Sequence, residues 1–136
     1  MTGTTVDTTE LATKLVGAWD LVSFHDVDES GTTLGDPLGP APCGTLLYTA
    51  DGEVAVSMMP TTPGVVPSYL GYAGRWQVEG GQVVHRIAIS SRADWVGITQ
   101  SRDAELRQDD LLVRATREVD GKPQRRVLHW RRKNPG

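Results

Sequence analysis

Hydrophobic and polar residues alternate along most of the chain, and this alternation predicts β-strands. Only Asp7–Val16 has helical spacing: Leu11 and Leu15 share a face, and Asp7 with Glu10 forms a capping-box pattern. From Gly17 onward the period is two residues, which is typical of a strand with one buried face. The alternation predicts eight strands: Gly17–His25, Gly44–Thr49, Glu53–Met59, Tyr72–Val78, Gln82–Ser90, Val96–Leu106, Asp110–Glu118 and Gln124–Arg132.

The segments between these strands are of two kinds. Asp51-Gly52, Gly80-Gly81, Asp109-Asp110 and Asp120-Gly121 indicate tight turns, whereas residues 26–43, 60–71 and 91–95 form longer loops. Successive connections of a meander alternate between its two ends, so we expect the three long loops at one end. Eight antiparallel strands in this order close into an up-and-down barrel without free edges.

The expected fold is therefore all-β: an eight-stranded antiparallel up-and-down barrel with a short N-terminal helix. The chain length of 136 residues suits a single domain. We expect that domain to span residues 1–136, with the barrel at 17–132 and residues 1–6 flexible. The barrel should resemble a cup with a closed base and a mouth bordered by loops, where binding sites commonly lie.

Composition narrows the range of partners. The chain is 38% hydrophobic and 23% charged with a formal net charge of -3, so nothing indicates nucleic acid or an anionic membrane as a partner. The basic run "RRVLHWRRK" alternates like a strand, which favours a solvated face over a phosphate-binding patch. With neither a signal peptide nor an apolar run of the roughly 20 residues that span a bilayer, we expect a soluble cytoplasmic protein.

The inventory of cysteines and glycines argues against cofactors. Cys43 is the only cysteine, so neither an internal disulfide nor a cysteine zinc cluster can form. The three histidines are scattered over three predicted strands, which is no metal motif. The sequence has no phosphate-binding glycine loop followed by a helix, which disfavours nucleotide cofactors. We therefore expect neither metal nor cofactor.

Two stretches resemble the ends of a lipocalin barrel. "GAWDLVSF" at Gly17–Phe24 resembles the Gly-x-Trp motif that opens the first lipocalin strand. "VLHWRR" at Val127–Arg132 resembles the end of the last strand, where an arginine packs on that tryptophan. The resemblance implies a contact between Trp19 and Arg131 or Arg132 at the closed end of the barrel.

The central part of the chain resembles one branch more closely. Asp36–Met59 and Tyr69–Arg102 are similar to the short lipocalin-like domain family of bacteria, whose members are small cytoplasmic barrels. This resemblance implies the fold, but it implies little about function, because many members have none assigned. Some small bacterial barrels of related shape are cofactor-free cyclases or isomerases, which is an analogy of fold alone.

Strand alternation also predicts which side chains face the interior. On Val96–Leu106 one face is heavily charged, so the face with Ile98, Gln100 and Arg102 should point inward. On the preceding strand Val83, His85, Ile87 and Ile89 share one face, which places His85 level with Gln100 and Arg102. The expected polar cluster is His85, Arg102, Gln100, Tyr48 and Tyr72, with walls of Trp76, Met58, Val56, Ile87 and Ile98 and with Trp95 at the mouth.

Each of these residues has a second interpretation. His85 is either a ligand contact or a neutral core histidine that bonds to a tyrosine or the backbone. Arg102 is either paired with an anionic or carbonyl-bearing ligand or is a structural arginine that reaches a carbonyl or a loop carboxylate such as Asp26. Trp76 and Tyr72 are residues that more often belong to a core than to a site.

The leading hypothesis is a barrel that binds a small, largely apolar metabolite carrying a carbonyl, enol or carboxylate. It would act as a cofactor-free cyclase or isomerase of polyketide-like metabolism. His85 would be the acid or base, Arg102 and Gln100 would stabilise negative charge, and Tyr48 or Tyr72 would orient the substrate or relay a proton. One alternative is a carrier or sensor without catalysis. Another is a structural barrel with a filled interior, acting through its surface or as a homodimer.

Overall fold

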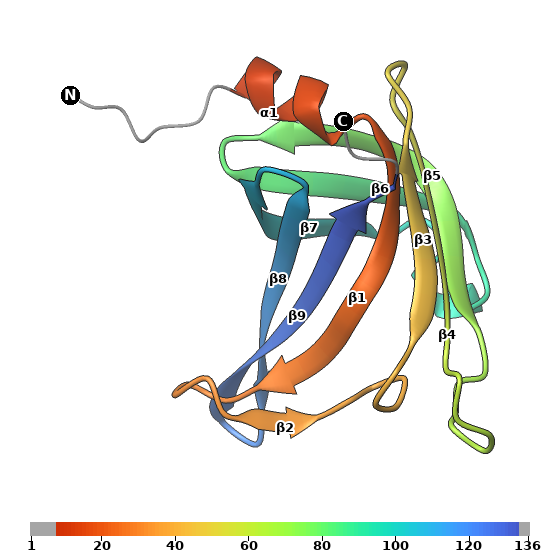
Figure 1. The fold of residues 1–136 in the computed structure, drawn as a ribbon, viewed down its shortest axis with the longest axis vertical. Helices are drawn as coiled ribbons and strands as arrows, with labels where there is room; N and C mark the ends of the chain where they lie inside the picture. Colours follow the sequence, from red (N-terminus) through yellow and green to blue (C-terminus); the bar gives the residue numbers. More distant parts are fainter. Residues whose placement is uncertain (1–7, 134–136) are drawn as a thin grey trace.

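The computed structural model describes residues 8–133, and the element order there is one helix followed by strands (Figure 1). The predicted capping role of Asp7 and the predicted flexibility of residues 1–6 lie outside the described residues. The elements are α1 (Thr8–Leu15), β1 (Gly17–Val27), β2 (Thr33–Gly35), β3 (Cys43–Tyr48), β4 (Glu53–Met59), β5 (Leu70–Glu79), β6 (Gln82–Ser90), the 3-10 turn η1 (Ala93–Trp95), β7 (Thr99–Arg107), β8 (Asp110–Val119) and β9 (Lys122–Arg132).

The strands form a closed antiparallel barrel. Within residues 8–133, β1 and β3 to β9 pair in chain order, and β1 also pairs with β9, so eight strands close the circle. The predicted all-β up-and-down barrel with a short helix is therefore confirmed. The short strand β2 lies in the loop predicted between the first two strands, and it pairs with the end of β1 at Asp26 and Val27. This pairing extends one wall of the barrel.

Helix α1 lies across one end of the barrel (Figure 1). Its apolar residues Leu11 and Leu15 are buried in the core, as their four-residue spacing predicts. The indole of Trp19 donates a hydrogen bond to the Leu15 carbonyl at 3.0 Å. The guanidinium of Arg132 covers the Trp19 ring, 4.2 Å from its centroid. The contact expected from the lipocalin motifs is thus made by Arg132, whereas Arg131 pairs with Asp110 on the outer surface.

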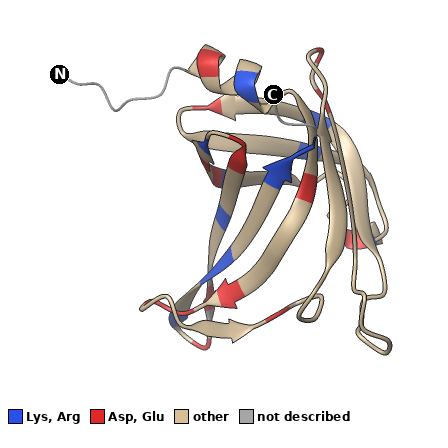
Figure 2. Ribbon diagram, viewed as in Figure 1, with Lys and Arg blue, Asp and Glu red and all other residues tan. Residues whose placement is uncertain are grey.

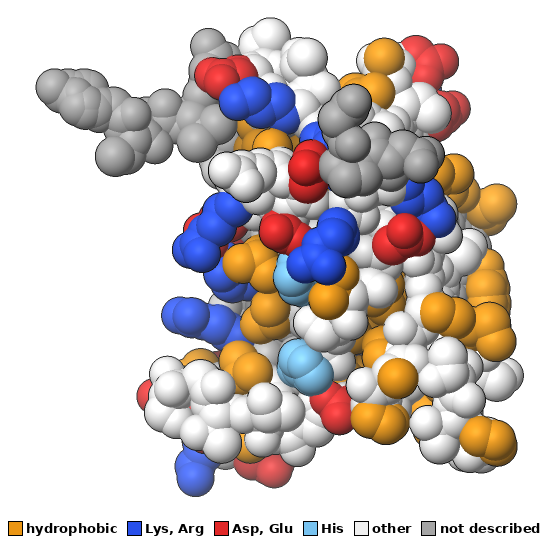
Figure 3. Space-filling model, viewed as in Figure 1, with side chains coloured by type: hydrophobic (Ala, Val, Ile, Leu, Met, Phe, Trp, Pro, Cys, Tyr) orange, Lys and Arg blue, Asp and Glu red, His pale blue; other side chains and the backbone are white. Residues whose placement is uncertain are grey.

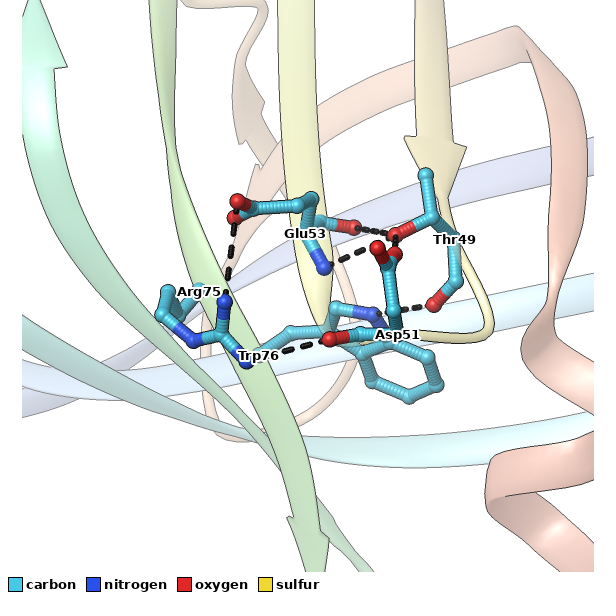
Figure 4. A network of polar contacts seen from close by, with 5 residues as sticks. All are labelled: Thr49, Asp51, Glu53, Arg75 and Trp76. Carbon is cyan, nitrogen blue, oxygen red and sulfur yellow. Dashed lines mark hydrogen bonds and ion pairs between the residues drawn. The ribbon is translucent and has the colours of Figure 1, made fainter.

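A polar network holds the turn between β3 and β4 (Figure 4). The Thr49 hydroxyl accepts the Glu53 N–H at 2.9 Å and donates to the Asp51 carboxylate. From the neighbouring strand β5, Arg75 donates to the Asp51 carbonyl, and the Trp76 indole donates to the Thr49 carbonyl, both at 3.0 Å. These bonds satisfy the turn and anchor Trp76 beside it.

A β-bulge reverses the facing of the last residues of β6. Gly74 pairs with Ile87 and Ala73 pairs with Ile89, so Ala88 has no opposite partner. Ile89 consequently lies on the outer surface and is 66% exposed. The expectation that Ile89 shares the inner face with Ile87 is wrong, because the extra residue shifts the alternation by one position.

The outer surface separates charged from apolar side chains. Figure 2 shows Lys and Arg along β8 and β9, and β3 contains no charged residue. Several basic residues of the C-terminal run form ion pairs on this surface, such as Arg131 with Asp110 and Lys133 with Asp20. Figure 3 shows hydrophobic side chains gathered over the β3 and β4 side of the molecule, where Leu47 is 42% exposed.

Among the described residues, no helix has the length and apolar character needed to cross a membrane.

Candidate ligand-binding site

The barrel interior contains a cavity lined mainly by apolar and aromatic side chains. It holds about 630 Å³ of space outside the protein atoms, its opening to solvent included. Pockets lined in this way, with a few convergent polar groups, are the usual form of small-molecule sites. The lining residues are Phe24, Leu46, Tyr48, Val56, Met58, Leu70, Tyr72, His85, Trp95, Gln100, Arg102, Val113, Arg126, Leu128 and Trp130.

At the centre of this lining His85 lies between two tyrosines. The Tyr48 hydroxyl, from β3, is 2.7 Å from His85 Nε2. The Tyr72 hydroxyl, from β5, is 2.5 Å from His85 Nδ1. His85 itself is 5% exposed, so both ring nitrogens are satisfied inside the barrel. The geometry thus combines the two interpretations of His85: it bonds to tyrosines, and it also lines the cavity.

Burial keeps the three rings neutral. Burial, together with the nearby positive charge of Arg102, lowers the pKa of His85 to about 4. Burial also raises the pKa of the Tyr72 hydroxyl, an effect that Arg102 partly offsets. The pKa of Tyr48 is raised well above its usual value by burial and by the proximity of Tyr72. At neutral pH the cluster therefore consists of a neutral imidazole and two neutral phenols.

Arg102 brings a positive charge to the same cavity. Its Nη1 donates to the Ser101 carbonyl at 3.1 Å, and burial lowers the pKa of the guanidinium. Among residues 8–133 no carboxylate contacts Arg102. Asp26, a candidate partner in the sequence, instead holds Arg126 in a bidentate pair at 2.9 and 3.2 Å. Arg102 thus faces the cavity with hydrogen-bond donors and without a carboxylate partner.

Gln100 and Trp95 complete the polar and aromatic lining. Gln100 lies directly opposite His85 in the pairing of β6 with β7, as the strand count predicts. Trp95 contacts the Tyr72 ring edge-on, with centroids 6.2 Å apart. The Arg92 guanidinium packs over Trp95 at 4.9 Å and holds the indole in place. Val56 and Met58 also line the cavity, as expected from the alternation of β4.

Three residues expected in the wall do not line the cavity. Trp76 packs on the Tyr48 ring at 4.5 Å, but its indole is tied to the turn between β3 and β4. Ile87 is buried outside the cavity lining. Ile98 is 42% exposed, because β7 begins after it and Gly97 has a φ of +86°, which interrupts the strand alternation.

Sequence reasoning missed Arg126 and the apolar residues contributed by β9. The spacing of Arg126, Leu128 and Trp130 by two residues is the signal that could have found them. Arg126 lies over the Phe24 ring at 5.3 Å while it pairs with Asp26. It adds a second guanidinium to the cavity lining beside that of Arg102, and the carboxylate of Asp26 neutralises its charge.

The other histidines pair with carboxylates and are absent from the cavity lining. His25 Nδ1 lies 2.5 Å from the carboxylate of Asp36, and His129 Nε2 lies 2.9 Å from that of Asp110. In the described part of the chain, no group of three or more His, Cys, Asp or Glu side chains is arranged to hold a metal ion.

The comparison with protein families agrees with this architecture. The family model described as a lipocalin-like domain matches residues 16–133. The chain belongs to this lipocalin-like domain family. The match confirms the family expected from the motifs, and it covers the whole barrel together with the closing contact between Trp19 and Arg132.

One curated protein resembles this lipocalin-like domain over most of its length. The 4'-hydroxy-3'-methoxypropiophenone carrier protein ppsC of Aspergillus oryzae is 30% identical over 96 residues, which cover 63% of this chain and 79% of that protein. A fluorescence-activating β-barrel designed de novo is 17% identical with a TM-score of 0.47, covering 90% of this chain and 96% of its own. The fluorescent protein UnaG is 14% identical with a TM-score of 0.43, covering 90% and 99%.

Proposed function

We propose that this lipocalin-like domain is a carrier that holds a small, largely apolar molecule with a carbonyl or related acceptor oxygen. The observation that carries the proposal is the cavity, in which an apolar lining surrounds Arg102 and the Tyr48–His85–Tyr72 cluster. An apolar wall suits the body of the molecule, and the donors suit its oxygen. The similarity to a protein named as a carrier of an aryl ketone supports this choice.

The arrangement around His85 favours carrying over catalysis. A general acid or base must reach the proton that it transfers, and its pKa should lie near the working pH. Both ring nitrogens of His85 are engaged by tyrosine hydroxyls, and burial lowers its pKa to about 4. The imidazole is thus a weak base without a free nitrogen, and it suits the role of holding the two tyrosines.

A cofactor-free cyclase or isomerase is the second candidate. It is favoured by the position of Arg102, whose positive charge acts on the Tyr72 hydroxyl inside the cavity. A guanidinium there would stabilise an enolate oxygen of a bound substrate. In that case Tyr72 and His85 would relay the proton, and the cavity would impose the reactive conformation.

The test is a fluorescence titration with 4'-hydroxy-3'-methoxypropiophenone, followed by mass spectrometry of the recovered compound. Trp95 and Trp130 line the cavity, so binding should change the tryptophan emission. The carrier proposal expects one molecule bound per chain and recovered unchanged. Arg86→Met is the control variant and should give the same result, because the Arg86 side chain is exposed. Conversion that is lost in His85→Gln would establish the cyclase instead. Absence of binding for this compound and for a panel of polyketide-like ketones would contradict both candidates.

The cytoplasmic location and the homodimer considered from the sequence stay predictions. Sedimentation velocity of the purified protein would decide the second.

A further inference from the structure

We infer that Tyr72 donates the hydrogen bond that binds the ligand's carbonyl oxygen, and that buried Tyr48 sets this role through His85. Tyr72 is then the residue that determines specificity, and His85 and Tyr48 are positioning residues. The inference rests on the proposed function, since it requires a ligand with an acceptor oxygen. It names the Tyr72 hydroxyl, rather than Tyr48 or His85, as the group that bonds to that oxygen.

The number of hydrogens in the cluster limits how its three side chains can bond to one another. A neutral imidazole has one N–H and one nitrogen lone pair. Since both nitrogens of His85 bond to tyrosines, one tyrosine must donate to the ring and the other must accept from it. The accepting tyrosine keeps its own hydroxyl hydrogen for another partner. The chain of bonds can therefore run in either of two directions.

Burial decides between the two directions. Tyr48 is 2% exposed, and in the described part of the chain His85 Nε2 is the hydrogen-bond partner of its hydroxyl. Tyr48 lines the cavity too, but it is almost closed off from solvent. If it accepted from the ring, its own hydrogen would therefore be buried without an acceptor in the ligand-free protein, which is costly. If Tyr48 donates to Nε2, the hydrogen of His85 is on Nδ1 and points to Tyr72. The Tyr72 hydroxyl, which is partly exposed and lines the cavity, then has its hydrogen free for a ligand.

The surrounding groups agree with this direction. Arg102 is a pure donor that faces the cavity, and Arg126 is a donor already engaged by Asp26. Burial raises the pKa of the Tyr72 hydroxyl, and the positive charge of Arg102 partly offsets this rise, so Tyr72 is a better donor than it would be without Arg102. The Trp95 ring makes a T-shaped contact with the Tyr72 ring and lines the same cavity, which adds an aromatic surface beside Tyr72. The cavity therefore selects a ketone or aldehyde that is attached to an apolar, preferably aromatic, body.

The first experiment compares two probes that differ at one carbon. Propiophenone carries the carbonyl, and propylbenzene has a methylene in its place. We expect the wild-type protein to bind propiophenone about tenfold more tightly, which is the fold-change that one ordinary hydrogen bond supplies. In Tyr72→Phe this preference should fall to within about twofold, while the affinity for propylbenzene stays the same. Tyr69→Phe is the matched control, because its hydroxyl bonds Ser57 and is absent from the cavity lining.

The second experiment reads the direction of the bonds without any ligand. Nitrogen-15 NMR of the full chain at neutral pH distinguishes the two tautomers of His85, with His25→Gln and His129→Gln used to assign the signal. We expect the hydrogen on Nδ1. A hydrogen on Nε2, or a ketone preference that survives in Tyr72→Phe, would overturn the inference and leave the carrier proposal standing. Failure of both probes to bind would instead overturn the carrier proposal and the inference that rests on it.

Discussion

The guanidinium of Arg132 stacks on Trp19 and at the same time donates a hydrogen bond to the Val16 carbonyl at 3.2 Å. It also donates to the carbonyl of Lys14 in the last turn of α1. One side chain at the end of β9 thus joins the first strand, the helix and the closed end of the barrel. The contact is buried, since Trp19 is inaccessible to solvent.

Arg132→Ala should lower the free energy of unfolding by about 2 kcal/mol, because it removes a cation–π contact and leaves the carbonyls of Lys14 and Val16 without this donor. Urea denaturation followed by circular dichroism measures the change. Arg131→Ala is the control, because Arg131 is exposed and pairs with Asp110 on the surface, where ion pairs contribute about 1 kcal/mol or less. Equal losses in the two variants would contradict the closing role of Arg132.

Gly74→Ala should prevent the normal pairing of β5 and β6. A Cβ at this position would lie 1.9 Å from the Arg86 carbonyl oxygen, so the backbone at the bulge would have to move. We expect a loss of about 3 kcal/mol or more in the free energy of unfolding, or no folded protein. Gly81→Ala is the control, since its Cβ would meet no atom within 4 Å, and it should stay within about 1 kcal/mol of the wild type. A stable Gly74→Ala variant would show that the bulge is not required.

The free energy of unfolding should decrease as the pH is lowered, because of His85. Its pKa is lowered to about 4 in the folded protein, below the value of about 6.5 in an unfolded chain. In that window the unfolded state binds more protons, so stability is complete above about pH 6.5 and is lost as the pH falls towards 4. The expected loss from this group is about 2 kcal/mol between about pH 7 and about pH 5.

The measurement is urea denaturation at several pH values for the wild type and for His85→Gln. Gln cannot titrate, so the free energy of unfolding of His85→Gln should change less over this pH range. Two parallel curves would mean that His85 is not a neutral buried base in the folded protein.

Arg102→Met should weaken binding of propiophenone only about twofold, because Arg102 acts on the carbonyl through the Tyr72 hydroxyl. It should leave stability within about 1 kcal/mol of the wild type, or raise it. The physical reason is that Arg102 is partly buried and contacts no carboxylate among the described residues, so its charge costs desolvation without an ion pair. Fluorescence titration and urea denaturation measure the two effects. A large loss of stability with unchanged affinity would make Arg102 a structural residue.

The sequence by itself determined the barrel and much of its inner surface. The period of two residues specifies β-strands, and the number and spacing of turns specify the meander, because both are properties of neighbouring residues. The same alternation placed Tyr48, Tyr72, His85, Gln100 and Arg102 on inner faces, and all five line the cavity. The Trp19 and Arg132 motifs also predicted a contact between the two ends of the chain.

Only the tertiary structure decided the partners and the exceptions. Alternation assigns a face but not a neighbour, so it could not show that Asp26 is held by Arg126 and that Arg102 is left facing the cavity. It could not place the bulge at Ala88, because an extra residue depends on the register of the opposite strand. The bonds of His85 with tyrosines 37 and 13 residues away depend on how the strands are staggered around the barrel. The stagger of the strands thus decides which polar groups have partners inside the protein and which remain available for a ligand.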